Sequence, residues 1–185
     1  MNRQIKISFF FILLVILDAC SSNLSSLYDS NFTLTNEIAK AKSSQLSVKI
    51  PQDWFTAEDN ENKLIDLWLI KDDYSATLNF VALNVDSLTM KEIQSDEIKF
   101  VVEFSKAFKK AKYGKTFGGF VKQETFEMNK KKFSAYEYLD DAKRNIRVVV
   151  FKSGNKFYEL SAIPVKTQNL QELYKIQNSV LSSID

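Results

Sequence analysis

Four consecutive runs of strand-like sequence, joined by short polar turns, constrain the fold of this chain more than any other feature. Apolar and polar residues alternate within each run, and turn-forming residues separate the runs. The runs are Val121–Met128, Lys132–Leu139, Asn145–Lys152 and Lys156–Ile163, with turns at Asn129–Lys131, Asp140–Lys143 and Ser153–Asn155. This spacing predicts an antiparallel meander, whose third strand is central because it is apolar on both faces.

The segments before and after the meander predict three further strands and two helices. Strands are expected at residues 46–50, 65–70 and 75–85, the last of them central, and helices at residues 89–112 and 169–184. The first helix begins at the capping box Thr89–Glu92 and ends before Gly114. Its expected core-facing residues are Ile93, Phe100, Val101, Phe104, Phe108 and Ala111. The element order β-β-β-α-β-β-β-β-α predicts an α+β fold, an antiparallel sheet covered by helices.

The N-terminus has the pattern of an export signal. Arg3 and Lys6 precede the apolar run Phe9–Leu17, which is shorter than the roughly 20 residues of a membrane-spanning helix. The last residue of this run begins the sequence Leu17-Asp18-Ala19-Cys20, and Cys20 is the only cysteine of the chain. This motif resembles the lipobox of bacterial lipoproteins, although Asp18 departs from the usual small or aliphatic residue. The resemblance implies cleavage before Cys20 and lipidation of Cys20; the alternative is an ordinary signal peptide that leaves a free cysteine.

The region after Cys20 indicates where the protein is located and how it is divided. Ser21 and Ser22 follow the cysteine, and absence of Asp there implies, by the same resemblance, a bacterial outer membrane with the domain facing the periplasm. Ser- and Asn-rich sequence up to Ser44 predicts a tether with a short helical turn near residues 37–42. The expected division is a signal peptide at 1–19, a lipidated N-terminus and tether at 20–44, and one α+β domain at 45–185.

Composition excludes several classes of function. The 185 residues include no histidine, which removes Ser-His-Asp and Cys-His catalysis and His-ligated zinc. Four glycines and the absence of phosphate-binding motifs leave no expected cofactor site. The 25 basic and 23 acidic residues give no overall charge for binding nucleic acid. We therefore expect no enzyme, no cofactor, no metal and no nucleic-acid partner.

Four groups of residues are candidates for chemistry, and each has a simpler structural interpretation. Asp53, Glu58, Asp59 and Glu61 offer oxygen ligands for calcium without the spacing of a calcium loop, so a solvated loop is favoured. The pairs Asp72-Asp73 and Asp140-Asp141 are interpreted as turn residues rather than as an acid and a base. The remaining two groups are a basic cluster of Lys106, Lys109, Lys110, Lys112, Lys115, Lys130, Lys131 and Lys132, and the aromatic set Trp54, Phe55, Trp68 and Tyr74.

The last two groups have both binding and structural interpretations. The lysines are suited to anionic lipid headgroups or an acidic partner, but a solvated helix end and a charged hairpin tip explain them more simply. The aromatic residues are suited to a ligand groove, but the core or its rim is the simpler location.

A first strand that ends in Pro51-Gln52-Asp53-Trp54, followed by this order of elements, resembles the PsbP/Mog1-like domains. The resemblance covers residues 45–184 and implies an α/β/α sandwich. Known members include a photosystem accessory protein, a nuclear transport factor that binds a small GTPase, and many bacterial lipoproteins. No specialised role of these members carries over residue by residue, so the resemblance supports the fold and hardly the function.

The sequence therefore leads to three hypotheses about function. The first is a non-enzymatic envelope lipoprotein that reaches the membrane through its N-terminal lipid and binds or supports another envelope protein. The second is a periplasmic module for a small or amphipathic ligand, and the least favoured is an enzyme without histidine. An exposed apolar patch would favour the protein partner, and a deep enclosed pocket would favour the small ligand.

Overall fold

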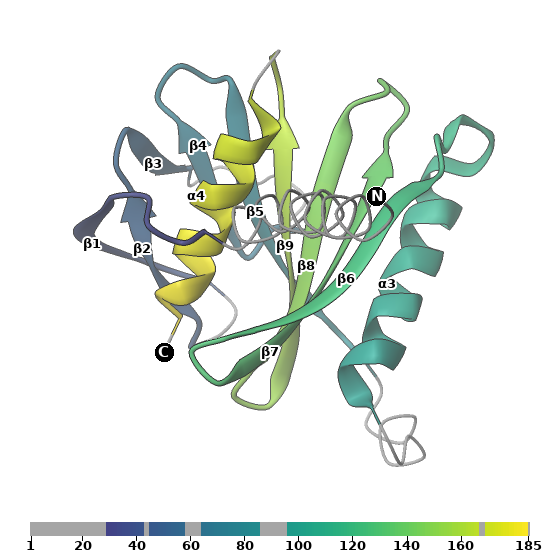
Figure 1. The fold of residues 1–185 in the computed structure, drawn as a ribbon, viewed down its shortest axis with the longest axis horizontal. Helices are drawn as coiled ribbons and strands as arrows, with labels where there is room; N and C mark the ends of the chain where they lie inside the picture. Colours follow the sequence, from purple (N-terminus) through teal and green to yellow (C-terminus); the bar gives the residue numbers. More distant parts are fainter. Residues whose placement is uncertain (1–28, 43–44, 58–63, 86–95, 167–168, 185) are drawn as a thin grey trace, which may run out of the picture.

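A seven-stranded antiparallel sheet organises the computed structural model, which describes residues 29–42, 45–57, 64–85, 96–166 and 169–184. The strand order is β3-β4-β5-β9-β8-β7-β6, and β1 and β2 form a separate two-stranded sheet (Figure 1). The strands are β1 Leu34–Lys40, β2 Ser47–Pro51, β3 Trp54–Ala57, β4 Leu67–Lys71, β5 Ala76–Leu83, β6 Phe120–Met128, β7 Lys131–Leu139, β8 Asn145–Ser153 and β9 Lys156–Pro164. The helices are α3 Glu97–Tyr113, the short 3-10 turn η2 Gly114–Thr116, and α4 Leu170–Ser182.

The predicted meander is confirmed as β6 to β9, each strand hydrogen-bonded to the next. Asn129 and Lys130 alone join β6 to β7, with φ angles of 52° and 61°. Two positive φ angles in a two-residue hairpin match the right-handed twist of the flanking strands. The sequence also places the central strands correctly, because β5 lies between β4 and β9, and β8 lies between β9 and β7.

Two strands, β1 and the short β3, were not predicted. Residues 34–40, expected within the tether and partly as a helical turn, form β1, which pairs with β2. Most β1 side chains are exposed, so the strand has no apolar alternation for sequence analysis to detect. Hydrogen bonds hold the segment in place: the Thr35 hydroxyl donates to the Ile50 carbonyl at 3.0 Å, and the Phe32 amide donates to Ser179 Oγ at 3.0 Å. The tether prediction for residues 20–44 is therefore wrong for residues 34–40.

The two helices differ in how well their starts were predicted. Helix α4 begins as expected, because Asn169 caps it by accepting from the amides of Gln171 and Glu172. Helix α3 begins at Glu97 rather than at Thr89, since Asp96 has a non-helical backbone with φ −141° and ψ 83°. The capping box at Thr89–Glu92 lies outside the described residues.

The helices cover opposite faces of the sheet. Helix α4 closes a core that contains Trp54, Leu78, Phe133, Phe151 and Leu160. Helix α3 packs on β7 and β8 and closes a second core that contains Tyr136, Val148, Val150 and Phe157. In Figure 1, α4 lies over the half of the sheet near β4 and β5, and α3 lies at the β6 end. The predicted fold class, an antiparallel α+β sheet covered by helices, is confirmed.

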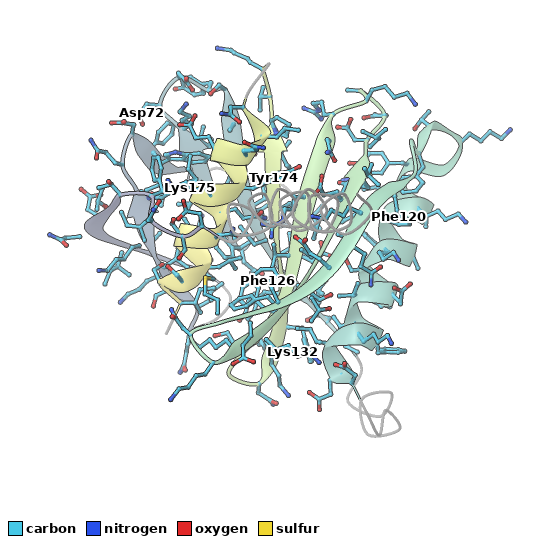
Figure 2. The ribbon with its side chains drawn as sticks, viewed as in Figure 1. Asp72, Phe120, Phe126, Lys132, Tyr174 and Lys175 are labelled. Atoms are coloured by element: carbon cyan, nitrogen blue, oxygen red, sulfur yellow. The ribbon has the colours of Figure 1, made fainter. Side chains whose placement is uncertain are left out.

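One buried cation fixes α4 on the sheet. Arg147 of β8 is 1% exposed, and its guanidinium donates to Gln177 Oε1 at 2.8 Å and to Asn178 Oδ1 at 2.9 Å. Glu124 of β6 lies 3.3 Å away, and the guanidinium lies over the rings of Phe126 and Tyr174, which Figure 2 labels. Burial lowers the pKa of Arg147, and Glu124 opposes that effect. Two elements, α4 and β6, thus supply the partners of this cation.

Arg147→Ala is expected to lower the free energy of unfolding by about 3–5 kcal/mol, because Glu124 and the two amide side chains would lose their buried partner. Urea denaturation measures this. Lys152→Ala is the control: Lys152 pairs with Glu97 at the surface, with both side chains more than two-fifths exposed, so its loss is expected to cost under about 1 kcal/mol. Equal effects of the two substitutions would contradict a special role for Arg147.

Candidate functional site

Helix α3 carries two apolar stripes, and the structure buries the smaller one. The residues that pack on the sheet are Ile98, Val101, Val102 and Ser105, which recur at spacings of three and four. Phe100, Phe104 and Phe108 instead remain 36%, 45% and 59% exposed. The predicted core face is therefore wrong for the phenylalanines, although it correctly includes Val101. An exposed row of three large aromatic residues is unusual for a helix on a soluble domain.

A polar cluster beneath α3 explains this rotation of the helix. Glu159 of β9 is 2% exposed, and it accepts hydrogen bonds from the Ser105 hydroxyl and, at 2.5 Å, from Lys109 Nζ. Ser105 also lies 2.5 Å from the Tyr136 hydroxyl of β7. Burial raises the pKa of Tyr136, and the Glu159 carboxylate adds to that rise, so this phenol stays protonated. Turning the phenylalanines inward would strip the buried carboxylate of its partners, which costs several kcal/mol.

The same contacts show in which direction the phenylalanine row lies. Lys109 Nζ, which pairs with Glu159 of β9, is also 5.9 Å from the centre of the Phe108 ring. On the other flank of the helix, Lys106 lies over Phe120 and bonds to Gln123 of β6. Phe108 therefore lies on the flank of α3 opposite to Lys106 and away from the β6 edge, and Phe104 and Phe100 precede it by four and eight residues on the exposed side of the helix.

Beyond the row, the α3 face of the sheet continues without a covering helix among the described residues. Helix α3 packs on β7 and β8 and reaches Glu159 of β9, whereas β3, β4 and β5 extend past it. Strand register places one set of side chains on this face, and they are half-buried: Trp68, Ile70, Thr77, Asn79, Val81, Leu83 and Ile163. We call the exposed phenylalanine row together with this part of the sheet the α3 trough.

Two buried polar atoms lie on the sheet side of the trough. Trp68 and Asn79 are directly opposite each other on β4 and β5. The indole Nε1 of Trp68 and the Oδ1 of Asn79 are both buried and have no hydrogen-bond partner among the described residues. Buried polar atoms of this kind normally have hydrogen-bond partners, so one donor and one acceptor are left unsatisfied here.

The predicted basic cluster divides into two separate groups. Helix α3 carries five lysines against two glutamates, with Lys110 and Lys112 in its last turn. The lysines of the β6–β7 hairpin lie elsewhere: Lys131 Nζ donates to the Ile184 carbonyl at 2.6 Å, and Lys132 pairs with Asp96 before the first turn of α3. Figure 2 shows Lys132 and Phe120 far apart on the molecule. Only the α3 lysines therefore share a helix with the phenylalanine row, and of these Lys106 lies on the β6 flank and Lys109 pairs with Glu159.

The carboxylate candidates do not form a site among the described residues. Asp72 and Asp73 lie in the β4–β5 turn, where Asp73 accepts hydrogen bonds from the Ser75 hydroxyl and, at 2.9 Å, from the Ser75 amide; this bonding lowers the pKa of Asp73. Asp140 begins the β7–β8 turn and accepts from the Arg144 amide and Nε. Their interpretation as turn residues is confirmed. Asp53 lies in the turn before β3, and no described group of three or more acidic or cysteine side chains is arranged to hold a metal.

Several other predicted residues are not brought together. Cys20, Glu58, Asp59 and Glu61 lie outside the described residues. Trp54 is buried in the α4-side core, which the aromatic set was expected to join, whereas Phe55 and Tyr74 are exposed and contact each other edge-on at 5.9 Å. Trp68 lies on the face opposite to Trp54. The described aromatic residues therefore do not line one groove.

An open hollow of about 480 Å³ lies elsewhere, between the β1–β2 sheet and β4. Glu37, Lys40 and Asp66 contribute charge to its lining, and Ile50, Leu67 and Trp68 contribute apolar surface. Its volume is in the range of small-molecule sites.

No helix within the described ranges is long and apolar enough to cross a membrane.

Ser105, Tyr136 and Glu159 were missed by sequence analysis, although a signal for one of them exists. Glu159 is the only charge between Phe157 and Ile163, in a run that is otherwise apolar or small. A lone carboxylate inside a central strand requires a buried partner. Ser105 has no comparable signal, because a serine on a helix is unremarkable until the strand opposite is known.

Glu159→Gln is expected to destabilise the protein by about 3–5 kcal/mol, because it leaves the partly buried Lys109 ammonium without its counter-ion. Urea unfolding measures the loss, and adding Lys109→Met should restore part of it. Glu103→Gln, which removes an exposed partner of Lys106, is the control and should be close to neutral. A double variant no more stable than Glu159→Gln alone would contradict this account.

Phe104→Ser is expected to change the free energy of unfolding by less than about 1 kcal/mol, because nearly half of the side chain is already in solvent. Val101 belongs to the buried stripe. Val101→Ser is therefore expected to lower the free energy of unfolding by about 3 kcal/mol, through lost packing and a buried hydroxyl. Chemical denaturation of the two variants compares the stripes directly. The opposite ranking would mean that the phenylalanines are the core face.

Comparisons with known proteins bear on the fold. No protein-family model matches the chain, and no curated protein matches it in sequence. The solution structure of cyanobacterial PsbP (CyanoP) from Synechocystis sp. PCC 6803 is similar, with a TM-score of 0.57 over 80% of this chain and 91% of that chain. The two sequences are 13% identical, so the likeness concerns the fold alone. The chain has a PsbP-like fold.

Proposed function

We propose that this protein is a lipid-anchored component of the bacterial envelope, held at the outer membrane through Cys20 and facing the periplasm. Its α+β domain acts as a non-enzymatic binding or scaffold module for another envelope protein. The anchoring half of the proposal rests on the sequence Leu17-Asp18-Ala19-Cys20 and the apolar run before it. The binding half rests on the α3 trough.

The exposed row Phe100, Phe104 and Phe108 is the observation that carries the binding role. Three aromatic side chains in line on one helix are costly to leave in water, and aromatic residues are the anchors most enriched in protein interfaces. The row continues onto sheet surface that no described helix covers. A large exposed apolar surface of this kind supports a protein partner over a small ligand.

The mechanism that follows from anchoring is confinement. A lipidated domain is restricted to a thin layer beside the membrane, so its effective concentration toward neighbours in that layer rises without any new contact. A partner bound with modest intrinsic affinity would then be held efficiently. No bond needs to be made or broken by the domain in this role.

The anchoring proposal predicts that Cys20 carries lipid and is the first residue of the mature protein. Mass spectrometry of the membrane-extracted protein should find the N-terminal peptide beginning at Cys20 with the added mass of acyl chains. The Cys20→Ala variant should carry no lipid and should associate more weakly with the membrane, because two or more acyl chains are needed for durable anchoring. An unmodified Cys20, or a Cys20→Ala variant with unchanged association, would overturn it.

The hollow between β1 and β4 supports a second candidate, a periplasmic module for a small or amphipathic ligand. Its volume of about 480 Å³ and its mixed lining of charged and apolar residues fit such a ligand. Trp68 belongs to the lining, so ligand binding there should change tryptophan fluorescence. Native mass spectrometry of protein purified from its own cell envelope would detect a retained small molecule. If no small molecule is retained, the second candidate fails and only the protein-partner proposal stands.

A further inference from the structure

We propose that strand β1 is a releasable strap, which separates from β2 while the seven-stranded sheet stays folded. Release adds the residues of β1 to the chain between Cys20 and the first fixed residue of the domain. A domain anchored through Cys20 is then held by a longer tether. The release of β1 stands on the contacts of the described residues, and only the lengthening of the tether rests on the proposed lipid anchor.

The ladder between β1 and β2 is short and interrupted. Regular pairing covers only residues 38–40 of β1; the register then shifts, and Leu34 lies opposite Pro51, which has no amide hydrogen to donate. Within the regular part, the Lys49 amide donates to Ser183 Oγ at 3.0 Å, so it points away from β1. By contrast, every residue of β5 has a partner in β9. Few backbone hydrogen bonds therefore break when β1 leaves.

The side chains of β1 add little burial. Ala39, which is 4% exposed, is the one residue of β1 that belongs to the buried core, and Leu34 and the preceding Phe32 are only partly buried against it. The free energy gained by burying apolar surface grows with its area, so an alanine contributes little. A segment with few buried apolar contacts opens at a lower free energy than the core strands do.

The contacts that remain are made by side chains at the edge of the domain. Thr35 Oγ1 bonds to the Ile50 carbonyl, and water can replace this bond because release exposes both partners. The ion pair of Asp29 with Lys175, at 3.3 Å, joins side chains that are each about one-third exposed. Pairs of this kind contribute little to stability. The strap is therefore held by several weak contacts.

The chain after β1 has a firm attachment to the rest of the domain. The Lys42 amide donates to the Asp66 carbonyl at 3.1 Å, just before β4. Ala41 is 6% exposed and belongs to the same core as α4. Release of β1 therefore ends at Ala41.

This end point sets how much the tether gains. With β1 in place, nine residue-to-residue steps lead from Cys20 to Asp29, the first residue of the described structure. With β1 released, twenty-one steps lead from Cys20 to Ala41. Because the longest reach of a chain is proportional to its number of steps, it more than doubles.

A disulfide clamp tests the release. Ile38 and Lys49 lie directly opposite each other, which places their Cα atoms about 4.5–5.5 Å apart, within the range that a disulfide spans. Hydrogen exchange is measured on the full chain carrying Ile38→Cys and Lys49→Cys, extracted from membranes, in its oxidised and reduced forms. Oxidation should slow exchange of residues 34–42 by at least about tenfold, because it blocks the local opening, and should leave β9 unchanged.

The matched control is a second clamp, Glu127→Cys with Lys132→Cys, at opposite positions on β6 and β7. Its oxidation should leave the exchange of residues 34–42 unchanged. If the first clamp does not slow exchange there, the inference is overturned. It is also overturned if residues 34–42 of the reduced form exchange as slowly as β9, because β1 would then open only when the whole domain unfolds.

A second measurement tests the length of the tether. Ala39→Asp buries a charge and should favour the released strand, whereas Ile38→Asp makes the same change in charge at a position that is 60% exposed. Each variant carries a fluorophore at Lys112→Cys on α3, which lies on the far side of the molecule from β1 in Figure 1. In vesicles with an acceptor dye on the lipid headgroups, Ala39→Asp should show less energy transfer than Ile38→Asp.

The outcomes separate this inference from the proposed function. If Cys20 carries no lipid, the proposed anchor fails, and the clamp experiment still decides whether β1 is released. If Ala39→Asp abolishes slow exchange in β9, the strand cannot separate from a folded sheet and the inference is overturned. Equal energy transfer from the two variants, with residues 34–42 of Ala39→Asp in fast exchange, would overturn the longer tether.

Discussion

Two buried charges of opposite sign, one on each face of the sheet, decide how the helices sit on it. Arg147 of β8 is held by the amide side chains of α4, and Glu159 of β9 is held by Ser105 and Lys109 of α3. Apolar packing alone permits a helix to rotate about its axis at modest cost, whereas a buried charge accepts only the rotation that satisfies it. Each helix is therefore positioned by one side chain of the central strands.

This positioning connects the interior of the protein to its surface. Because Ser105 must face Glu159, the smaller apolar stripe of α3 is buried and the larger side chains Phe100, Phe104 and Phe108 face outward. The exposed row is thus a consequence of internal electrostatics and not of a surplus of apolar residues. The polar cluster specifies which surface is presented to a partner, while its net contribution to stability is small compared with the cost of breaking it.

Local patterns made much of the fold predictable. Alternation and turn residues located β6 to β9, and the apolar periodicity and the Asn169 cap located α4, because these signals lie within each segment. The rotation of α3 was not predictable, since two apolar stripes compete and Glu159, some fifty residues away, decides between them. Strand β1 was also missed, because its stability comes from β2 and α4 and not from its own pattern. The trough follows from such long-range contacts, so it was out of reach of sequence analysis.

Strand β1 also limits how far the domain could move from a membrane in which Cys20 is anchored. The described structure begins at Asp29, which pairs with Lys175 of α4, and eight residues lie between Asp29 and Cys20. Even fully extended, the nine residue-to-residue steps from Cys20 to Asp29 span at most about 30 Å. While β1 is in place, a domain anchored through Cys20 would therefore stay within that distance of its lipid. The end of the molecule that carries β1 and α4 would lie nearest the bilayer. Helix α3, at the other end of the sheet in Figure 1, would then point away from the lipid and toward neighbouring proteins.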